Sequence, residues 1–218
     1  MPRAFVFDAY GTLFDVHATI ARYRGAAGPE ADRFSEIWRT KQLEYTWTLT
    51  LAGDYVEFWS LTERALDFAF ARFPSVDRAL KAKLLDAYLT LDAYADAHPV
   101  LRDLKQRGQA TAILSNGSPK MLAAAVKAAK LDDQLDAVLS VDAIRIYKPR
   151  AEVYAMAAKH FRLAPADIVF ISSNRWDVMG AARYGFHTVW VNRSGVPDEY
   201  QPAPGAVLRD LNGVLKLL

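Results

Sequence analysis

The sequence predicts an α/β fold, in which helices cover a parallel sheet and a separate helical segment follows the first strand. Two observations predict it. Short apolar runs of strand length alternate with helical patterns from residue 99 onward, and residues 16–97 show helical signals only. Alternating strands and helices favour a parallel sheet with right-handed crossovers, because parallel strands need a connection that returns across the sheet.

The first predicted strand is the apolar run from Ala4 to Phe7, and a carboxylate, Asp8, follows it at once. Gly11 and Thr12 then turn the chain sharply, as glycine allows. In an open α/β sheet, ligands bind outside the carboxyl ends of the strands. Asp8 is therefore expected to face a pocket.

Residues 16–97 carry apolar side chains at helical spacing. Asp54 with Glu57 resembles a capping box in which Asp54 is the N-cap of the following helix. We interpret the apolar stripes mainly as packing surfaces, since a stripe of this kind buries one helix face against a neighbour. The stripes consist of Phe34, Ile37 and Trp38; of Phe58, Leu61, Ala65, Phe68 and Ala69; and of Leu80, Leu84, Tyr88 and Leu91.

The alternation begins with a helix between Pro99 and Gly108, because proline suits the first turn of a helix and glycine its C-terminal cap. The sequence therefore predicts a Rossmann-like core of residues 1–15 plus 98–218, with residues 16–97 as a helical cap over the carboxyl edge of the sheet. The later predicted strands are 111–114, 137–139, 168–171 and 188–191, and the helices between them are 119–129, 150–161 and 177–184, the last capped by Gly185.

Composition excludes several classes of function. The 218 residues are 52% hydrophobic and 12% aromatic, which suits one α/β domain with a modest insertion. With 27 basic and 25 acidic residues, the net charge of +2 gives no electrostatic case for binding nucleic acid or a membrane surface. The absence of cysteine excludes disulfides, thiol nucleophiles and thiolate metal sites. No signal peptide or bilayer-length apolar run precedes or interrupts the fold, so we expect a soluble cytoplasmic protein.

Polar side chains stand where four predicted strands end. One polar strand end is uninformative, because loops are generally polar. Four of them imply a site, since the carboxyl ends of parallel strands meet at one edge of a sheet. The residues are Asp8; then Ser115, Asn116 and Gly117; then Lys148; and finally Ser172, Ser173 and Asn174, with Asp177 one helical turn further on.

These motifs resemble the haloacid dehalogenase superfamily and, within it, the L-2-haloacid dehalogenases. The segments that carry the resemblance are residues 8–16, 114–117, 148–150 with Tyr154, and 172–177. Their order and spacing extend over essentially the whole chain. The resemblance implies hydrolysis of short-chain L-2-haloalkanoic acids to 2-hydroxy acids with inversion, release of halide ion, and a homodimer.

Tyr10 separates this chemistry from phosphate ester cleavage. Phosphatases of the superfamily typically carry a second Asp at that position, because an alkoxide leaving group needs a proton. A halide leaves without one. Magnesium prefers oxygen ligands that include carboxylates, whereas the last strand end offers Ser172, Ser173 and Asn174 and keeps only Asp177 as a carboxylate. We therefore expect no metal and no other cofactor.

The resemblance also implies a mechanism. Asp8 attacks the α-carbon, expels halide and forms an ester with inversion at that carbon. Lys148 lies near Asp8 and keeps it ionised. Water then attacks the acyl carbon of the ester, with Asp177 as the base and Asn174 in support of Asp177. Thr12, Tyr154 and Ser172 position these groups.

The remaining site residues follow from the resemblance. Arg39, Asn116 and Trp176 are expected to bind the halide. Ser115, Lys148 and the backbone amides of Ala9 and Tyr10 are expected to hold the substrate carboxylate. Tyr10, Gln42 and Phe58 then line the pocket. The four histidines, His17, His98, His160 and His187, show no metal-ligand spacing.

The sequence leaves alternatives open. Arg39 could be a solvated helical arginine, Ser115 and Asn116 could only cap the following helix, and Trp176 could be core. The whole chain could be a magnesium-dependent small-molecule phosphatase or a phosphoglucomutase-like enzyme of the same superfamily. It could also be a non-catalytic binding member. The preferred halogen, fluoride included, the chain length and the physiological substrate are not encoded in any recognisable motif.

Overall fold

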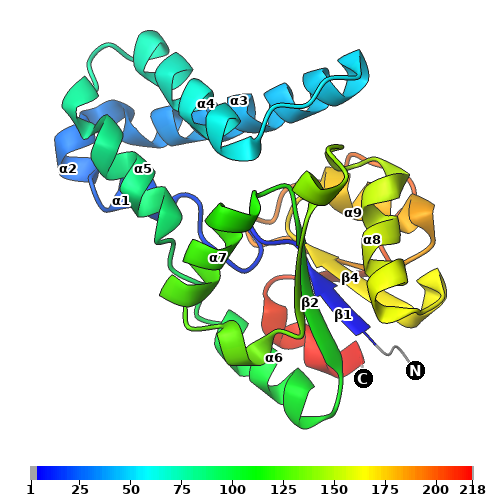
Figure 1. Ribbon diagram of the computed structural model, residues 1–218. Helices are drawn as coiled ribbons and strands as arrows, with labels where there is room; N and C mark the ends of the chain where they lie inside the picture. The colour runs from blue at the N-terminus through cyan, green and yellow to red at the C-terminus, as the bar shows by residue number, and fades with distance from the viewer. Residues whose placement is uncertain (1–3, 218) are drawn as a thin grey trace.

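The computed structural model describes residues 4–217 and contains a six-stranded parallel sheet with helices on both faces (Figure 1). The strand order is β3-β2-β1-β4-β5-β6, so the first strand lies in the interior of the sheet. The predicted α/β fold is confirmed. The strands are β1 (Ala4–Phe7), β2 (Ala110–Ser115), β3 (Ala137–Ser140), β4 (Ile168–Ser172), β5 (His187–Val191) and β6 (Ala206–Leu208).

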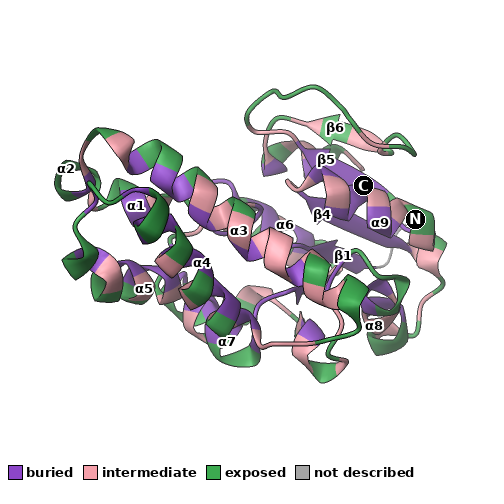
Figure 2. Cartoon of the chain, turned by 90° about the horizontal axis from the view of Figure 1, so that it is seen from above, coloured by how far each residue is buried: buried purple, intermediate pink, exposed green. Residues whose placement is uncertain are grey.

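The central strand of the sheet is inaccessible to solvent. All four residues of β1 are completely buried, as expected for a strand that is covered on both faces and paired on both edges. Phe7 pairs with Ile113 of β2 and with Ile171 of β4. This register places the next residue, Asp8, level with Ser172 at the carboxyl edge. Figure 2 shows β4 and β5 as mostly buried, whereas β6 lies at the exposed margin.

The helices of the core are α6 (Ala97–Gln106), α7 (Pro119–Ala128), α8 (Ala151–Phe161) and α9 (Arg175–Tyr184). In Figure 1, α6 and α7 lie on one side of the sheet and α8 and α9 on the other. Pro99 lies in the first turn of α6, and Gly108 follows its end with φ of +71°. Helix α9 begins two residues earlier than predicted, with Asn174 as its N-cap, so Asp177 lies inside its first turn.

The segment between β1 and α6 forms a helical layer beyond the carboxyl edge of the sheet (Figure 1). Buried Phe34, Trp38, Leu61 and Ala65 belong to its interior, where α3 packs against α4. Leu80, Leu84, Tyr88 and Leu91 are buried as well. The helices are α1 (Ala18–Ala21), α2 (Arg24–Ala27), α3 (Ala31–Ala52), α4 (Phe58–Arg72) and α5 (Lys81–Leu89), and we call them the cap helices.

Two predictions in this layer are wrong. The N-cap of α4 is Glu57, whose side chain accepts from the Ser60 amide at 3.2 Å, and not Asp54. Residues 54–57 are non-helical, and the Val56 carbonyl accepts from the Tyr147 hydroxyl at 2.6 Å instead of from a helical amide. Phe68 is 38% exposed, so it lies outside the packing stripe.

Two short chain segments join the cap helices to the sheet. Phe14 forms an antiparallel bridge with Ala93, and the Tyr94 amide donates to the Leu13 carbonyl at 2.8 Å. The two crossings therefore run side by side. Within residues 4–217, no helix combines the length and the apolar character that a membrane crossing requires.

The C-terminal part contains elements that the sequence did not indicate. Strand β6 has three residues and a 3-10 helix spans Leu211–Leu217. Neither is long enough to show a clear hydrophobic period, so pattern reasoning finds no signal there.

Candidate active site

A lysine bridges two carboxylates at the carboxyl edge of the sheet. The Lys148 Nζ atom lies 3.1 Å from Asp8 Oδ1 and 2.8 Å from Asp177 Oδ2. The Lys148 side chain is 1% exposed and that of Asp177 is fully buried. Buried charges are tolerated only when they are paired. The attraction between the Lys148 ammonium and the two carboxylates therefore holds the three groups together, although they come from distant parts of the chain.

The second oxygen of Asp8 is fixed by two other donors. Asp8 Oδ2 accepts from Asn174 Nδ2 at 2.8 Å and from Thr12 Oγ1 at 3.1 Å. Thr12 Oγ1 in turn accepts from the Ser173 amide at 2.8 Å, and Ser172 Oγ accepts from the Asn174 amide at 3.1 Å. The Asp8 carboxylate thus has one defined orientation.

The side chain of Asn174 was predicted to support Asp177, and this prediction is wrong, because that side chain donates to Asp8. The Asn174 side chain donates to Asp8, and at 3.3 Å to the Tyr10 carbonyl. Its location at the N-cap of α9 directs the side chain back toward β1. The hydroxyl that contacts Asp177 comes instead from Tyr154 on α8, whose Oη donates to Asp177 Oδ1 at 2.8 Å.

The protonation of Asp177 differs from that of an ordinary carboxyl. Burial, together with the nearby charge of Asp8, raises the pKa of Asp177 to about 6, although Lys148 and Tyr154 act in the opposite direction. Burial acts to lower the pKa of Lys148, but the two carboxylates outweigh it and raise that pKa above its usual value. Asp177 can therefore exchange a proton near neutral pH beside a lysine that stays charged.

The contact between α8 and α9 depends on Gly180. A Cβ atom at this position would collide with Tyr154 Oη and would lie 2.7 Å from Pro149 Cβ. Only glycine lets α9 approach Tyr154 closely enough for the bond to Asp177. No motif in the sequence marks Gly180.

We expect Gly180→Ala to destabilise the fold by about 1–3 kcal/mol, because the added methyl overpacks the contact between the helices. Turnover should fall as well, since α9 carries Asp177 away from Tyr154. Thermal unfolding of the variant measures the first effect. Gly25→Ala is the matched control, because a Cβ at Gly25 meets nothing within 4 Å. Equal melting temperatures for the two variants would contradict the packing argument.

Arg39 reaches the site from cap helix α3. Its guanidinium donates to the Tyr10 carbonyl at 3.1 Å through Nη2 and to Gln42 Oε1 at 2.6 Å through Nη1. Gln42 is buried and donates to Thr62 Oγ1 at 2.6 Å. Arg39 is thus a held side chain and not a freely solvated one, and both of these acceptors are neutral.

The Tyr10 side chain forms one wall of the site. Its ring stacks on Tyr88 with centroids 5.5 Å apart and contacts Phe58 at 6.1 Å. The Tyr10 hydroxyl is buried and has no hydrogen-bond partner among residues 4–217. A buried hydroxyl normally finds a partner, so this one is free for a ligand.

The other predicted contacts have structural partners as well. Ser115 Oγ accepts from the Gly117 amide at 3.1 Å, and Asn116 Oδ1 accepts from the Lys148 amide at 3.1 Å. These bonds leave the Asn116 amide hydrogens available. Trp176 packs edge-to-face on Trp47 of α3, with centroids 5.4 Å apart. It is half-buried at the boundary between cap helix and core, and not in the hydrophobic interior.

The family follows from comparison with known proteins. The sequence pattern of the haloacid dehalogenase-like hydrolases matches residues 2–185. The chain belongs to that family. Among its relatives, (S)-2-haloacid dehalogenase 4A of Burkholderia cepacia is 49% identical over 203 residues, which are 93% of this chain and 88% of the relative.

Solved structures agree with that assignment. A dehalogenase solved with an intermediate complex is 44% identical to this hydrolase with a TM-score of 0.97, over 100% of this chain and 97% of the other. An L-2-haloacid dehalogenase from Xanthobacter autotrophicus with chloropropionic acid covalently bound is 36% identical, with a TM-score of 0.88, over 100% and 98%. The resemblance to the 2-haloacid dehalogenases is confirmed.

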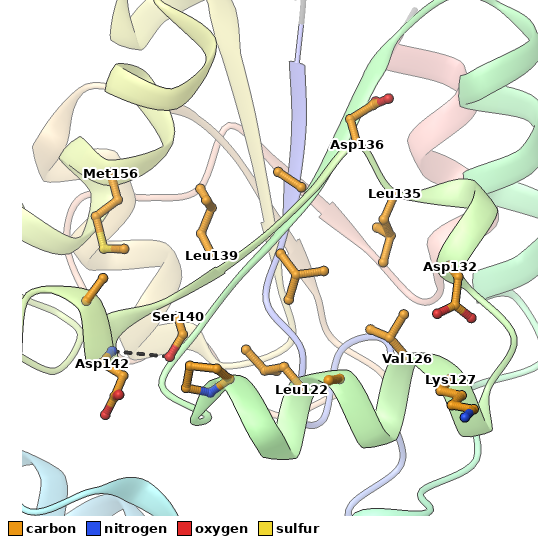
Figure 3. Close-up of a pocket in the computed structure, with 15 residues that line it drawn as sticks. Leu122, Val126, Lys127, Asp132, Leu135, Asp136, Leu139, Ser140, Asp142 and Met156 are labelled. Carbon is orange, nitrogen blue, oxygen red and sulfur yellow. Dashed lines mark hydrogen bonds between the residues drawn. The ribbon is translucent and has the colours of Figure 1, made fainter.

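The candidate site lies apart from a sizeable hollow at the other side of the sheet edge. A hollow of about 800 Å³ lies between α7, β3 and α8 and is lined by apolar side chains such as Leu122, Leu139 and Met156 (Figure 3). None of the predicted site residues lines it. A cavity of about 240 Å³ does border the site, with Tyr10, Arg39 and Asn174 among its lining residues.

Pattern reasoning missed two residues of this hydrolase's site region. Tyr88 had been assigned only to an apolar stripe, but its hydroxyl bonds with Gln42 and its ring stacks on Tyr10. Arg193 follows β5 and donates to the Thr12 carbonyl at 3.1 Å and to Asp96. Tyr88 could have been recognised as a tyrosine within an otherwise aliphatic stripe, and Arg193 as a polar residue after a fifth strand end.

Proposed function

We propose that this chain hydrolyses short-chain L-2-haloalkanoic acids to 2-hydroxy acids with inversion, through an ester on Asp8. The observation that carries the proposal is the buried Lys148, which lies between Asp8 and Asp177 at 3.1 and 2.8 Å. The proposed nucleophile, the proposed base and a positive charge between them lie within hydrogen-bond distance, which supports these roles. The relatives described as (S)-2-haloacid dehalogenases support the same substrate class.

In the first step, an oxygen of Asp8 attacks the α-carbon of the haloacid. The new carbon–oxygen bond forms as the carbon–halogen bond breaks, and the halide leaves with the bonding electrons, so the carbon inverts. No proton is needed at the leaving group, which agrees with Tyr10 two residues after the nucleophile. The relative that holds covalently bound chloropropionic acid supports an ester of this kind.

In the second step, water attacks the acyl carbon of the Asp8 ester and transfers a proton to Asp177. The acyl carbon–oxygen bond then breaks, the departing alkoxide oxygen takes the proton back from Asp177, and the 2-hydroxy acid leaves while Asp8 loses its remaining proton to water and is a carboxylate again. The carbon of the substrate is untouched, so the inversion persists. Lys148, Thr12 and Asn174 already donate to the Asp8 oxygens in the resting site. They are placed to stabilise the tetrahedral oxyanion, at about 3–4 kcal/mol per well-aimed donor.

The donors around Asp8 do not fit a magnesium ion. Both oxygens of Asp8 already accept hydrogen bonds, and Asn174 directs its Nδ2 atom toward them. The Lys148 ammonium lies where a cation would neutralise the two carboxylates. Among residues 4–217, no group of three or more His, Cys, Asp or Glu side chains could hold a metal ion.

Other roles belong to the same proposal. The segment 16–97 acts as a cap that closes the site. Arg39, Asn116 and Trp176 bind the departing halide, and the neutral acceptors of Arg39 leave its charge available for it. Ser115, Lys148 and the backbone near Ala9 hold the substrate carboxylate, while Tyr10, Gln42 and Phe58 line the pocket. Thr12, Ser172 and Tyr154 position the reacting groups.

Halide release in the presence of chelator tests the function. The substrates are chloro-, bromo- and fluoroacetate and both enantiomers of 2-chloropropionate. We expect turnover of chloro- and bromoacetate and of the L enantiomer, unchanged by chelator. Phosphate release from small esters that requires magnesium would support the phosphatase alternative instead. A folded protein that releases neither halide nor phosphate would indicate a binding member.

We also propose a homodimer in the cytoplasm, as the family resemblance implies. Light scattering after size-exclusion chromatography measures the mass directly. A mass of one chain at working concentration would contradict the dimer.

A further inference from the structure

The 240 Å³ cavity reaches almost to the nucleophile. It lies between cap helix α3 and the loop after β5, and Tyr10, Arg39 and Asn174 are among its lining residues. Asn174 Nδ2 is 2.8 Å from Asp8 Oδ2. Asp8 itself is only 6% exposed, so a substrate needs a route to it. This cavity ends one side chain away from Asp8.

The other end of the cavity lies at the surface. Its lining includes Ser194 and Val196 of the loop after β5, and His17 near the start of the cap helices. All three are exposed, and Val196 is 51% exposed. The cavity therefore connects solvent at the loop after β5 with the half-buried Asn174, the neighbour of Asp8.

The lining of the cavity suits an anion. Among the described residues that line it there is no Asp or Glu. Arg39 contacts two neutral acceptors, so its positive charge is uncompensated in the lining. Arg193 is paired with Asp96, and Ser173 Oγ is buried without a hydrogen-bond partner among residues 4–217. Although the His17 residue is exposed overall, partial desolvation of its imidazole and the nearby charge of Arg39 lower the pKa of His17 below its usual value, so His17 adds no charge at neutral pH.

The larger hollow offers an anion no such path. Its lining includes Asp132, Asp136 and Asp142, all of which are labelled in Figure 3. No residue of the candidate site borders it. The smaller cavity is therefore the better route for an anion to Asp8, although the other hollow has the larger volume.

We propose that this cavity is the anion port of the enzyme, through which the haloacid enters and the halide leaves. The inference rests on the proposed function and adds the route, together with Val196 as a residue that controls it. An anion in a cavity is sensitive to charge at the rim, because water screens the rim only partly and the walls are of low dielectric.

Val196→Glu and Val196→Lys test the port. At low ionic strength, we expect kcat/KM for L-2-chloropropionate to fall about two- to fourfold in Val196→Glu and to rise by a similar factor in Val196→Lys. At about 1 M salt the difference should vanish, since the Debye length is then about 3 Å. Val196→Gln controls for side-chain size.

Val138→Glu is the matched control for charge. Val138 is also an exposed valine, at 41%, and it lines the larger hollow. It should leave kcat/KM unchanged. An effect of Val138→Glu equal to that of Val196→Glu, or equal activity of the Glu and Lys variants at Val196, would overturn the port.

A binding measurement separates failure of the port from failure of the proposed function. Bromide titrated into the resting protein, followed by tryptophan fluorescence, needs no turnover. The bromide dissociation constant should be about two- to fourfold higher in Val196→Glu than in the wild type and lower in Val196→Lys. Unchanged bromide affinity in both variants contradicts the port whether or not the wild type releases halide from haloacids.

Discussion

Asp8→Asn is expected to lower turnover by about four to six orders of magnitude, because an amide is too weak a nucleophile to displace halide and form the ester. The variant should still fold, since Lys148 keeps its partner Asp177 at 2.8 Å. Its stability should fall, because three donors surround a side chain that now has only one acceptor oxygen. Halide release and thermal unfolding measure the two effects.

The control for Asp8→Asn is Asp133→Asn. Asp133 is exposed and lies in the short 3-10 helix Asp132–Gln134 that precedes β3, outside the candidate site, so the same chemical change there should alter neither quantity. Substantial halide release by Asp8→Asn, free of deamidated protein, would show that another group attacks the substrate.

The pH dependence should separate the two steps. Because the pKa of Asp177 is raised to about 6, the base is lost as pH falls through that value. At pH 5 about one tenth of Asp177 remains ionised, so ester hydrolysis should slow about tenfold. The first step needs no proton acceptor. Rapid-quench measurement at pH 5 should therefore show a burst of one halide per active site, followed by slow turnover.

Two variants sharpen this prediction. Asp177→Asn can keep both contacts, its oxygen accepting from Lys148 and its amide donating to Tyr154 Oη, but it cannot take a proton. It should stop at the ester, which intact mass spectrometry detects. Tyr154→Phe removes the hydrogen bond from the Tyr154 hydroxyl, which favours the ionised form of Asp177. The pKa of Asp177 should therefore rise, and the fall of turnover at acid pH should begin at a higher pH. A fall that begins at an unchanged pH in Tyr154→Phe would argue against Asp177 as the base.

Much of the core was predictable because its signals are local. The buried run at β1, the glycines that end α6 and α9, and the order of polar strand ends are all visible in the sequence. In a parallel sheet, that order alone brings Asp8, Lys148 and Asp177 to one edge. The structure does bring these three together.

The rest depends on packing between segments that are distant in sequence. Asp54 has a better local capping pattern than Glu57, but the helix begins later, and the loop before it is bonded to Tyr147 of the core. Whether the Asn174 side chain donates to Asp8 or to Asp177 depends on where α9 starts. The importance of Gly180 appears only when α8 is in place. No hydrophobic period in the sequence indicates these contacts between distant segments.

A single turnover in heavy-oxygen water, with enzyme in excess over an L-2-haloacid, tests the ester on Asp8 most directly. We expect the first 2-hydroxy acid to carry ordinary oxygen taken from the Asp8 carboxylate. Solvent oxygen should remain in the enzyme and be located at Asp8 by mass spectrometry of the peptide. Solvent oxygen in the product of the first turnover would mean that water attacks the substrate directly, and would contradict the covalent mechanism.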